Sequence, residues 1–187
     1  DGRETVGVPE LLQRFEAELG LRCLGRSRVL AITGTNGKTT TTALTAHLLV
    51  SGGLNAVSAG NIGRPLSAVA LEDDPPDWLA VELSSFQLHD MPGLLPTVGV
   101  LTNLSPDHLD RYPTLADYYA DKAQLFRNAT NASTWITNGD DAEVQRMAAP
   151  AAGVHRRFST SRVADGWYDR RAQALMLGRD TLLSRRE

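Results

Sequence analysis

The residues best suited to chemistry lie in the stretch GTNGKTT, residues 34–40, which we call the phosphate loop. Gly34 and Gly37 allow a tight turn whose backbone N–H groups point inward, and Lys38 adds a positive charge beside them. The helix predicted to begin here adds the positive end of its dipole. Thr39 would place a hydroxyl on Mg²⁺. The sequence therefore predicts a phosphate-binding turn.

This stretch matches the core of the phosphate-loop motif but not the whole of it. The full motif has another glycine five residues before the second one, where this chain has Ile32. The alternative is an ordinary glycine turn followed by a chance Gly-Lys-Thr. The strand–turn–helix context favours phosphate binding.

Carboxylates and a histidine follow two further predicted strands. Glu82 stands near the end of the strand at residues 77–84, and Asp107, His108 and Asp110 follow the strand at residues 96–104. Ligands of open α/β sheets bind beyond the carboxyl ends of the strands, and oxygen ligands suit Mg²⁺. The apolar neighbours of Glu82 predict that it is buried and needs a partner, rather than a solvated edge residue. Spacing alone does not decide whether His108 is a ligand or a neutral surface residue.

Lys122 is unusual because 17 of the 19 basic residues are arginines and Lys38 is the only other lysine. A helix is predicted at residues 114–129, with Thr114 as its N-cap. Lys122 falls in its apolar stripe, which we predict to contain Leu115, Tyr119, Lys122, Phe126 and Ala129. One interpretation is that the aliphatic part of the Lys122 side chain packs on the core while its ammonium group reaches water. The other is a buried amine of lowered pKa, which can add CO₂ to form a carbamate able to bind Mg²⁺.

The elements that must position these residues alternate between strands and helices. Near-continuous apolar strands are typical of a parallel sheet covered on both faces. We therefore predict an α/β mononucleotide-binding fold: a mostly parallel sheet flanked by helices, with a phosphate loop and a small antiparallel β tail after residue 160. Strands are expected at residues 28–33, 55–60, 77–84, 96–104, 133–137 and 154–159, and helices at 9–19, 38–50, 64–71, 114–129 and 140–148.

Composition sets limits on the class of protein. The 187 residues suffice for one sizeable core, and a net charge of −3 gives no electrostatic case for nucleic acid or an anionic membrane. The single cysteine, Cys23, excludes an internal disulfide and fits a reducing compartment. No apolar run approaches the roughly 18 residues of a membrane span. Because the chain begins at Asp1, we expect it to be part of a longer protein.

Several segments together resemble the Mur ligases of peptidoglycan synthesis. They are GTNGKTT (34–40), GNIG (60–63), ELSSFQL (82–88), NLSPDHLDRY (103–112) and YYADKAQLF (118–126). The resemblance covers residues 28–142 well, and GNIG and SSFQL point to the members that add D-glutamate. The siblings that add the third residue typically have a histidine where this chain has Phe86, and folylpolyglutamate synthetases are more distant relatives.

The resemblance implies a cytoplasmic, monomeric, ATP-dependent carboxylate–amine ligase. ATP would convert the carboxylate of UDP-N-acetylmuramoyl-L-alanine to an acyl phosphate, which the amine of D-glutamate attacks. Lys38, His108 and Lys122 would be catalytic, with two Mg²⁺ ions and a CO₂-derived carbamate on Lys122 as cofactors. Thr39 and Glu82 would bind one ion, and His108 and Lys122 the second. The ATP phosphates would lie on Gly34, Thr35, Asn36, Gly37, Lys38, Thr39 and Thr40, and the substrate on Asn61, Ser84 and Gln87.

The resemblance also implies a domain organisation. Residues 1–27 would be a linker and helix entering the ATP-binding domain, and residues 28–187 the central domain, incomplete at its C-terminal end. The family's N-terminal uridine-nucleotide domain and C-terminal amino-acid domain would lie outside this chain, so we expect the chain alone to be inactive. The alternatives are a sibling ligase, a folylpolyglutamate synthetase, or a phosphate-loop nucleotide switch or binding module, which would need no carbamylated lysine.

Overall fold

A computed structural model describes residues 8–107 and 111–185, with side chains from residue 15 onward. The strands form one nine-stranded sheet of order β2-β3-β1-β4-β5-β6-β7-β8-β9. Pairing is parallel from β2 through β7, whereas β8 and β9 add antiparallel pairs at the edge. The strands are β1 Arg28–Thr33, β2 Ala56–Gly60, β3 Trp78–Glu82, β4 Val98–Leu101, β5 Thr134–Asn138, β6 Val154–Ser159, β7 Gly166–Asp169, β8 Ala174–Leu177 and β9 Asp180–Ser184. The predicted fold class is confirmed.

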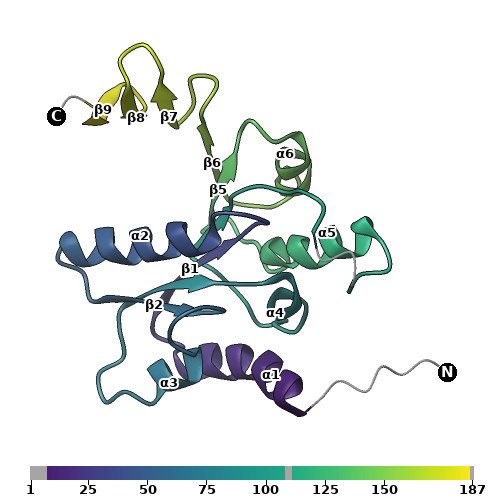
Figure 1. Cartoon of the computed structure of the whole chain (residues 1–187). Coiled ribbons are helices and arrows are strands. Elements are labelled where there is room, and N and C mark those ends of the chain that lie inside the picture. The colour runs from purple at the N-terminus through teal and green to yellow at the C-terminus, as the bar shows by residue number, and fades with distance from the viewer. Residues whose placement is uncertain (1–7, 108–110, 186–187) are drawn as a thin grey trace.

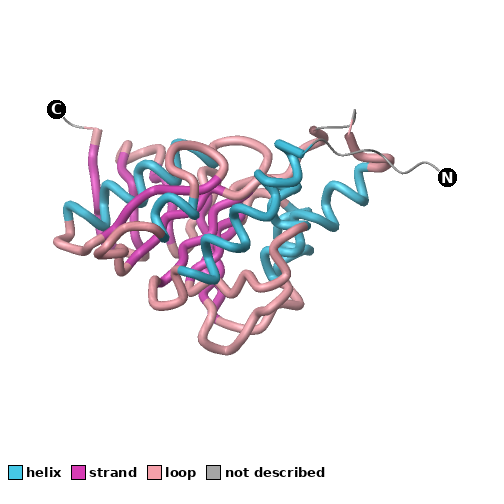
Figure 2. The backbone as a smooth tube through the Cα atoms, turned by 90° about the horizontal axis from the view of Figure 1, so that it is seen from below, coloured by secondary structure: helices cyan, strands magenta, loops and turns pink. Residues whose placement is uncertain are grey.

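Helices connect the parallel strands, as the alternating pattern predicts. They are α1 Val8–Cys23, α2 Lys38–Ser51, α3 Leu66–Ala70, α4 Ser85–His89, α5 Leu115–Ala123 with a 3₁₀ turn η1 Gln124–Phe126, and α6 Ala142–Ala148. Figure 1 shows α2 on one side of the sheet and α4, α5 and α6 on the other. Figure 2, turned by 90° from Figure 1, shows the helices beside the strands of the sheet.

The two faces of the sheet are covered unequally. The larger core cluster joins strand residues to Ala17 of α1, Leu66 of α3, Leu88 of α4 and Val144 of α6. The smaller cluster, on the face of α2, consists of Ile32, Ala46, Ala80 and Val100. Beyond α2, this face presents half-buried side chains such as Val98 and Ile136. A parallel sheet is normally covered on both faces, so this face is only partly covered within the described chain.

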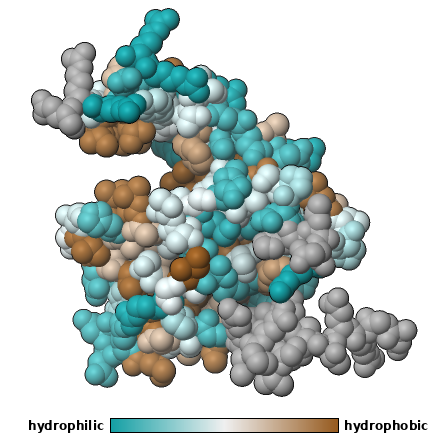
Figure 3. All heavy atoms as spheres, viewed as in Figure 1, coloured by the Kyte–Doolittle hydropathy of each residue, from teal (hydrophilic) through white to brown (hydrophobic). Residues whose placement is uncertain are grey.

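The antiparallel tail β7–β9 projects from the body of the domain (Figure 1). Four of its leucines are 48–65% exposed, namely Leu175, Leu177, Leu182 and Leu183. Figure 3 shows hydrophobic side chains under the tail facing others on α2 across a hollow. None of the described helices combines the length and apolar character needed to cross a membrane.

Two local features differ from the predictions. Helix α4 was not predicted; its signal is the pair Ser84 and Gln87, which form a capping box at its start. Along α5 and η1, the fully buried stripe contains Tyr118, Lys122 and Leu125, whereas the neighbouring Tyr119 and Phe126 are only half-buried. The observed buried stripe is thus displaced by about one residue from the predicted stripe, and Lys122 belongs to both.

Candidate active site

The phosphate loop lies between β1 and α2, as predicted. Gly34 (φ 143°) and Gly37 (φ 81°) have left-handed backbone conformations that favour glycine, and α2 begins at Lys38 without a side-chain cap. Lys38 Nζ donates to the carbonyl oxygen of Thr35 at 2.9 Å, so its charge lies across the loop. Ile32, at the position where the full motif has glycine, is a fully buried residue of β1. The departure therefore falls inside the strand and leaves the turn unchanged.

We expect Gly34→Ala to destabilise the chain. A Cβ at this position would lie 2.0 Å from Thr102 Oγ1, and the backbone φ is one that L side chains rarely adopt. Thr102 cannot easily turn away, because its hydroxyl donates to Asn36 O at 2.8 Å. Strain and overpacking should cost about 2–4 kcal/mol, measured by urea unfolding of this chain. Gly53→Ala is the matched control, because Gly53 has φ 83° with open space around it. Equal losses in the two variants would contradict the predicted clash.

Glu82 is the last residue of β3 and pairs in register with Ile32, directly beside the start of the phosphate loop. Its side chain is buried (2% exposed), as predicted. Its partner is Asn61, whose Nδ2 donates to Glu82 Oε1 at 3.2 Å. The predicted metal ligand and a predicted substrate residue therefore contact each other at one edge of the sheet.

Ser84 and Gln87 lie immediately after Glu82, at the start of α4. Gln87 N donates to Ser84 Oγ at 3.1 Å, and Gln87 Oε1 accepts from Ser84 N at 3.0 Å. These groups thus fix the turn from β3 into α4, a structural role that the sequence reasoning did not include. Their position beside Glu82 is compatible with the substrate role implied by the family.

Lys122 is buried beneath the phosphate loop and only 2% exposed, so its head does not reach water. Its Nζ donates to Thr33 Oγ1 at 3.1 Å and to Gly34 O at 2.9 Å. Burial is the main cause that lowers the pKa of Lys122 to about 7, and the positive charge of Lys38 lowers it further. The carboxylates of Asp107 and Glu82 oppose this shift. The amine is therefore available in its neutral form near neutral pH.

Helix α5 holds Lys122 in place through contacts at both ends. Thr114 and Asp117 form a capping box at its start, which confirms the predicted N-cap. Asp121, the neighbour of Lys122, accepts from Tyr112 OH at 2.9 Å and lies 2.7 Å from His89 Nδ1 of α4. These contacts tie α5 to α4 next to Lys122.

The remaining predicted metal residues are only partly described. His108 and Asp110 lie outside the described residues. Within the described ranges, no group of three or more His, Cys, Asp or Glu side chains forms a metal site. A Mg²⁺ ion held by one or two protein ligands and substrate phosphates does not require such a group. Glu82, a buried carboxylate, and Thr39, an exposed hydroxyl at the start of α2, offer oxygen donors that fit this kind of site.

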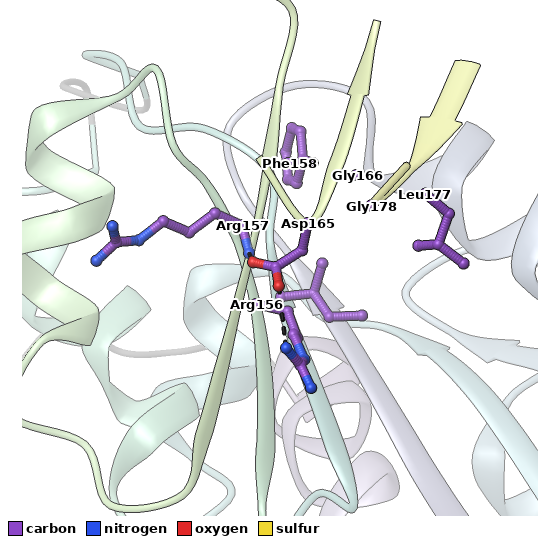
Figure 4. A pocket seen from close by; sticks show the side chains of 8 residues that line it. Arg156, Arg157, Phe158, Asp165, Gly166, Leu177 and Gly178 are labelled. Carbon is purple, nitrogen blue, oxygen red and sulfur yellow. Dashed lines mark hydrogen bonds and ion pairs between the residues drawn. The ribbon is translucent and has the colours of Figure 1, made fainter. Parts of the chain in front are cut away.

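A separate cavity of about 500 Å³ opens between β6 and the tail (Figure 4). It is lined by Ile136, Arg156, Arg157, Phe158, Asp165, Gly166, Leu177 and Gly178. Asp165 accepts from Arg157 N at 2.8 Å and from Arg156 Nη1 at 3.0 Å, and these bonds lower the pKa of Asp165. Because β6 is three strands away from β1 in the sheet, this cavity is not part of the site around the phosphate loop.

The loop between β1 and α2, with a buried carboxylate at the end of the adjacent strand, defines a phosphate-loop α/β domain of the nucleotide-binding class. Residues 32–180 match the family model described as the Mur ligase middle domain. The chain therefore belongs to the Mur ligase family, and the resemblance seen in its motifs is confirmed.

Similar proteins include two named UDP-N-acetylmuramoylalanine--D-glutamate ligase. One from Gloeobacter violaceus is 48% identical over 139 residues, covering 73% of this chain and 31% of the relative. One from Aromatoleum aromaticum is 40% identical over 192 residues, covering 98% of this chain and 40% of the relative. The chain thus spans about a third of the length of the curated relatives it matches.

Solved structures show the same fold. A UDP-N-acetylmuramoyl-L-alanyl-D-glutamate--2,6-diaminopimelate ligase is 26% identical with a TM-score of 0.67, over 90% of this chain and 41% of that structure. A MurF ligase from Thermotoga maritima, solved in complex with ADP, is 22% identical with a TM-score of 0.67. The match covers 89% of this chain and 42% of that structure.

Proposed function

We propose that this chain is the central ATP-binding domain of a longer ligase that joins D-glutamate to UDP-N-acetylmuramoyl-L-alanine. The names of the curated relatives support the choice of D-glutamate. The observation that carries the proposal is the buried amine of Lys122 in contact with the phosphate loop. A nucleotide switch or a simple binding module has no need for such an amine.

In this proposal the phosphate loop holds the β- and γ-phosphates of ATP. The N–H groups at the start of α2 and the dipole of this helix favour negative charge at this point. Lys38 would exchange its contact with Thr35 O for a phosphate oxygen, which is a small movement of a flexible side chain. The backbone of Gly34, Thr35, Asn36, Gly37, Thr39 and Thr40 would surround the phosphates.

We place two Mg²⁺ ions beside these phosphates, one held by Thr39 and Glu82 and the other by His108 and Lys122. When bound, they would neutralise the charge that develops on the transferred phosphoryl group. Glu82 would then exchange its hydrogen bond with Asn61 for a metal contact. This frees the Asn61 amide for the substrate, next to Ser84 and Gln87.

Lys122 contributes as a carbamate in this scheme. A neutral amine has two N–H donors and one lone pair, and both donors are engaged by Thr33 Oγ1 and Gly34 O. The Thr33 hydroxyl itself donates to Leu83 O at 2.8 Å, so it can only accept from Lys122. The lone pair is left to attack CO₂: the N–C bond forms while one C=O π bond of CO₂ breaks and leaves a negative charge on oxygen. The nitrogen then gives one proton to water and keeps one N–H, so one of its two hydrogen bonds is lost. The product is an anion with two oxygens that suit Mg²⁺.

The reaction then has two steps. A carboxylate oxygen of UDP-N-acetylmuramoyl-L-alanine attacks the γ-phosphorus, the bond to the β-phosphate oxygen breaks, and ADP leaves. The amine of D-glutamate attacks the acyl carbon and loses a proton, and phosphate leaves as the amide forms. The protein mainly positions the reactants and their charges in such a transfer.

The remaining substrate and domain contacts would come from outside this chain. Residues 1–27 would lead into the domain and residues 28–187 would form most of it, between a uridine-nucleotide domain and an amino-acid-binding domain. The partly covered sheet face and the exposed leucines of the tail support packing against further chain. We propose that the complete enzyme works as a monomer in the cytoplasm.

The test is phosphate release by the complete enzyme with ATP, Mg²⁺ and UDP-N-acetylmuramoyl-L-alanine. We expect release to require D-glutamate and to be absent with L-lysine, diaminopimelate or L-glutamate. This 187-residue chain alone should release none above background, because it lacks the domains that would hold the other substrates. Dependence on another amino acid would move the proposal to a sibling ligase, and near-normal turnover by this chain alone would refute the domain assignment.

A further inference from the structure

The segment that follows β4, residues 102–105, runs alongside the phosphate loop and is here called the β4 tail. Its backbone and side chains contact the loop repeatedly. Thr35 N donates to Asn103 O at 3.0 Å, and Ser105 N donates to Thr35 Oγ1 at 3.0 Å. Thr102 Oγ1 donates to Asn36 O at 2.8 Å. The loop is thus bonded at Thr35 and Asn36 to a neighbouring strand end.

Asn103 makes the most specific of these contacts. Asn36 N donates to Asn103 Oδ1 at 2.9 Å, and Asn103 Nδ2 donates to Asn36 O at 2.9 Å. One side-chain amide therefore pairs with both backbone groups of a single loop residue. Only an amide offers an acceptor and a donor at this spacing, and the two backbone groups fix which end of the amide faces which partner.

The β4 tail is itself held from its other side. Leu104 N donates to Asp141 Oδ2 at 2.8 Å, while Asp141 Oδ1 accepts from Glu143 N and Val144 N at the start of α6. Asn103 thus stands on a segment anchored to a helix, which makes it a firm support for the exposed loop.

We infer that Asn103 is a positioning residue that sets the phosphate-binding shape of the loop through its paired hydrogen bonds to Asn36. By fixing the two peptide groups that flank Asn36, it fixes the direction of the Gly37 N–H, which lies in the same peptide plane as Asn36 O. This inference rests on the proposed function for its use in catalysis, but its effect on phosphate binding is independent of the amino acid added.

The experiment compares Asn103→Leu and Asn103→Asp in the complete enzyme. Leucine removes both hydrogen bonds; aspartate keeps the shape and the acceptor but turns a carboxylate oxygen toward Asn36 O. We expect the dissociation constant for ADP and the KM for ATP to rise about tenfold or more in both variants. The KM for D-glutamate should stay unchanged, because the proposed function places the amino acid on a domain outside this chain.

Asn128→Leu is the matched control, since Asn128 Nδ2 also donates to two backbone carbonyls, of Pro92 and Leu94, away from the loop. It should lose comparable stability and keep wild-type ADP affinity. Unchanged ADP affinity in both Asn103 variants, or an equal loss in the Asn128 control, would overturn the inference. An Asn103-dependent ADP affinity without D-glutamate-dependent phosphate release would instead refute the ligase and leave the positioning role intact.

Discussion

Replacing Lys122 by arginine is expected to lower the turnover of the complete enzyme by about 10²-fold or more, the usual effect of losing one group that stabilises transition-state charge. The reason is chemical. A guanidinium stays protonated at any ordinary pH and cannot add CO₂, whereas the buried amine of Lys122 has a pKa lowered to about 7. The measurement is D-glutamate-dependent phosphate release at saturating substrates, with circular dichroism and ADP binding to verify that the variant is folded.

A second variant separates loss of the carbamate from damage to the fold. Lys122→Ala leaves a space beside Thr33 and Gly34, and a short carboxylic acid at high concentration can place its two oxygens there. We expect such an acid to restore part of the activity of Lys122→Ala and none of Lys122→Arg, whose side chain fills the space.

Arg127→Lys provides a matched exchange at an exposed position just after η1 and should leave turnover unchanged. Wild-type-like turnover in Lys122→Arg would show that the lysine serves only to anchor α5 to the loop. Partial rescue of the alanine variant by a neutral amide as well as by an acid would count against a charged carbamate.

Much of the fold could be predicted because its signals are local. The apolar run at residues 28–33 and the glycines after it specify β1 and the phosphate loop, since few backbone conformations satisfy both. Glu82 could be placed because strand ends of a parallel sheet meet at one edge. The position of Lys122 on the apolar stripe of α5 left two interpretations open, a side chain with its head in water or a buried amine, and the structure shows that the amine is buried.

The rest depends on contacts between segments far apart in the chain. Spacing could not show that Lys122 meets Thr33 and Gly34, 89 and 88 positions away. Asn103 was missed for the same reason, because its value lies in matching two backbone groups of Asn36. Helix α4 was missed although Ser84 and Gln87 carry its capping signal; the family resemblance assigned these two residues to the substrate instead.

The other large effect we expect is a stability of this chain that depends on the protonation of Lys122. The pKa of this amine is about 7 in the folded chain and ordinarily 10.5. Between these values the unfolded chain binds the proton and the folded chain does not, so the free energy of unfolding must rise with pH. Below pH 7 both states are protonated, and the cost of burying the cation is fully present.

The expected size follows from the shift in pKa. Each unit of difference is worth about 1.4 kcal/mol, so raising the pH from 7 to 9 should add about 2 kcal/mol to the free energy of unfolding through this group. The measurement is urea unfolding of this chain in CO₂-free buffer, because carbamate formation would withdraw the neutral amine. Lys122→Met is the reference, since methionine keeps an unbranched chain in the same place and cannot titrate.

The difference between the two chains removes the contribution of every titrating group that does not interact with Lys122. Methionine leaves Thr33 Oγ1 and Gly34 O without their donor, which lowers stability by a roughly constant amount and does not change the slope. We therefore expect the wild-type curve to rise relative to Lys122→Met above pH 7 and to flatten toward pH 10.5. Parallel curves over this range would mean that the amine stays charged in the folded chain. An amine that stays charged could not react with CO₂, so parallel curves would also remove the physical basis for a carbamate at Lys122.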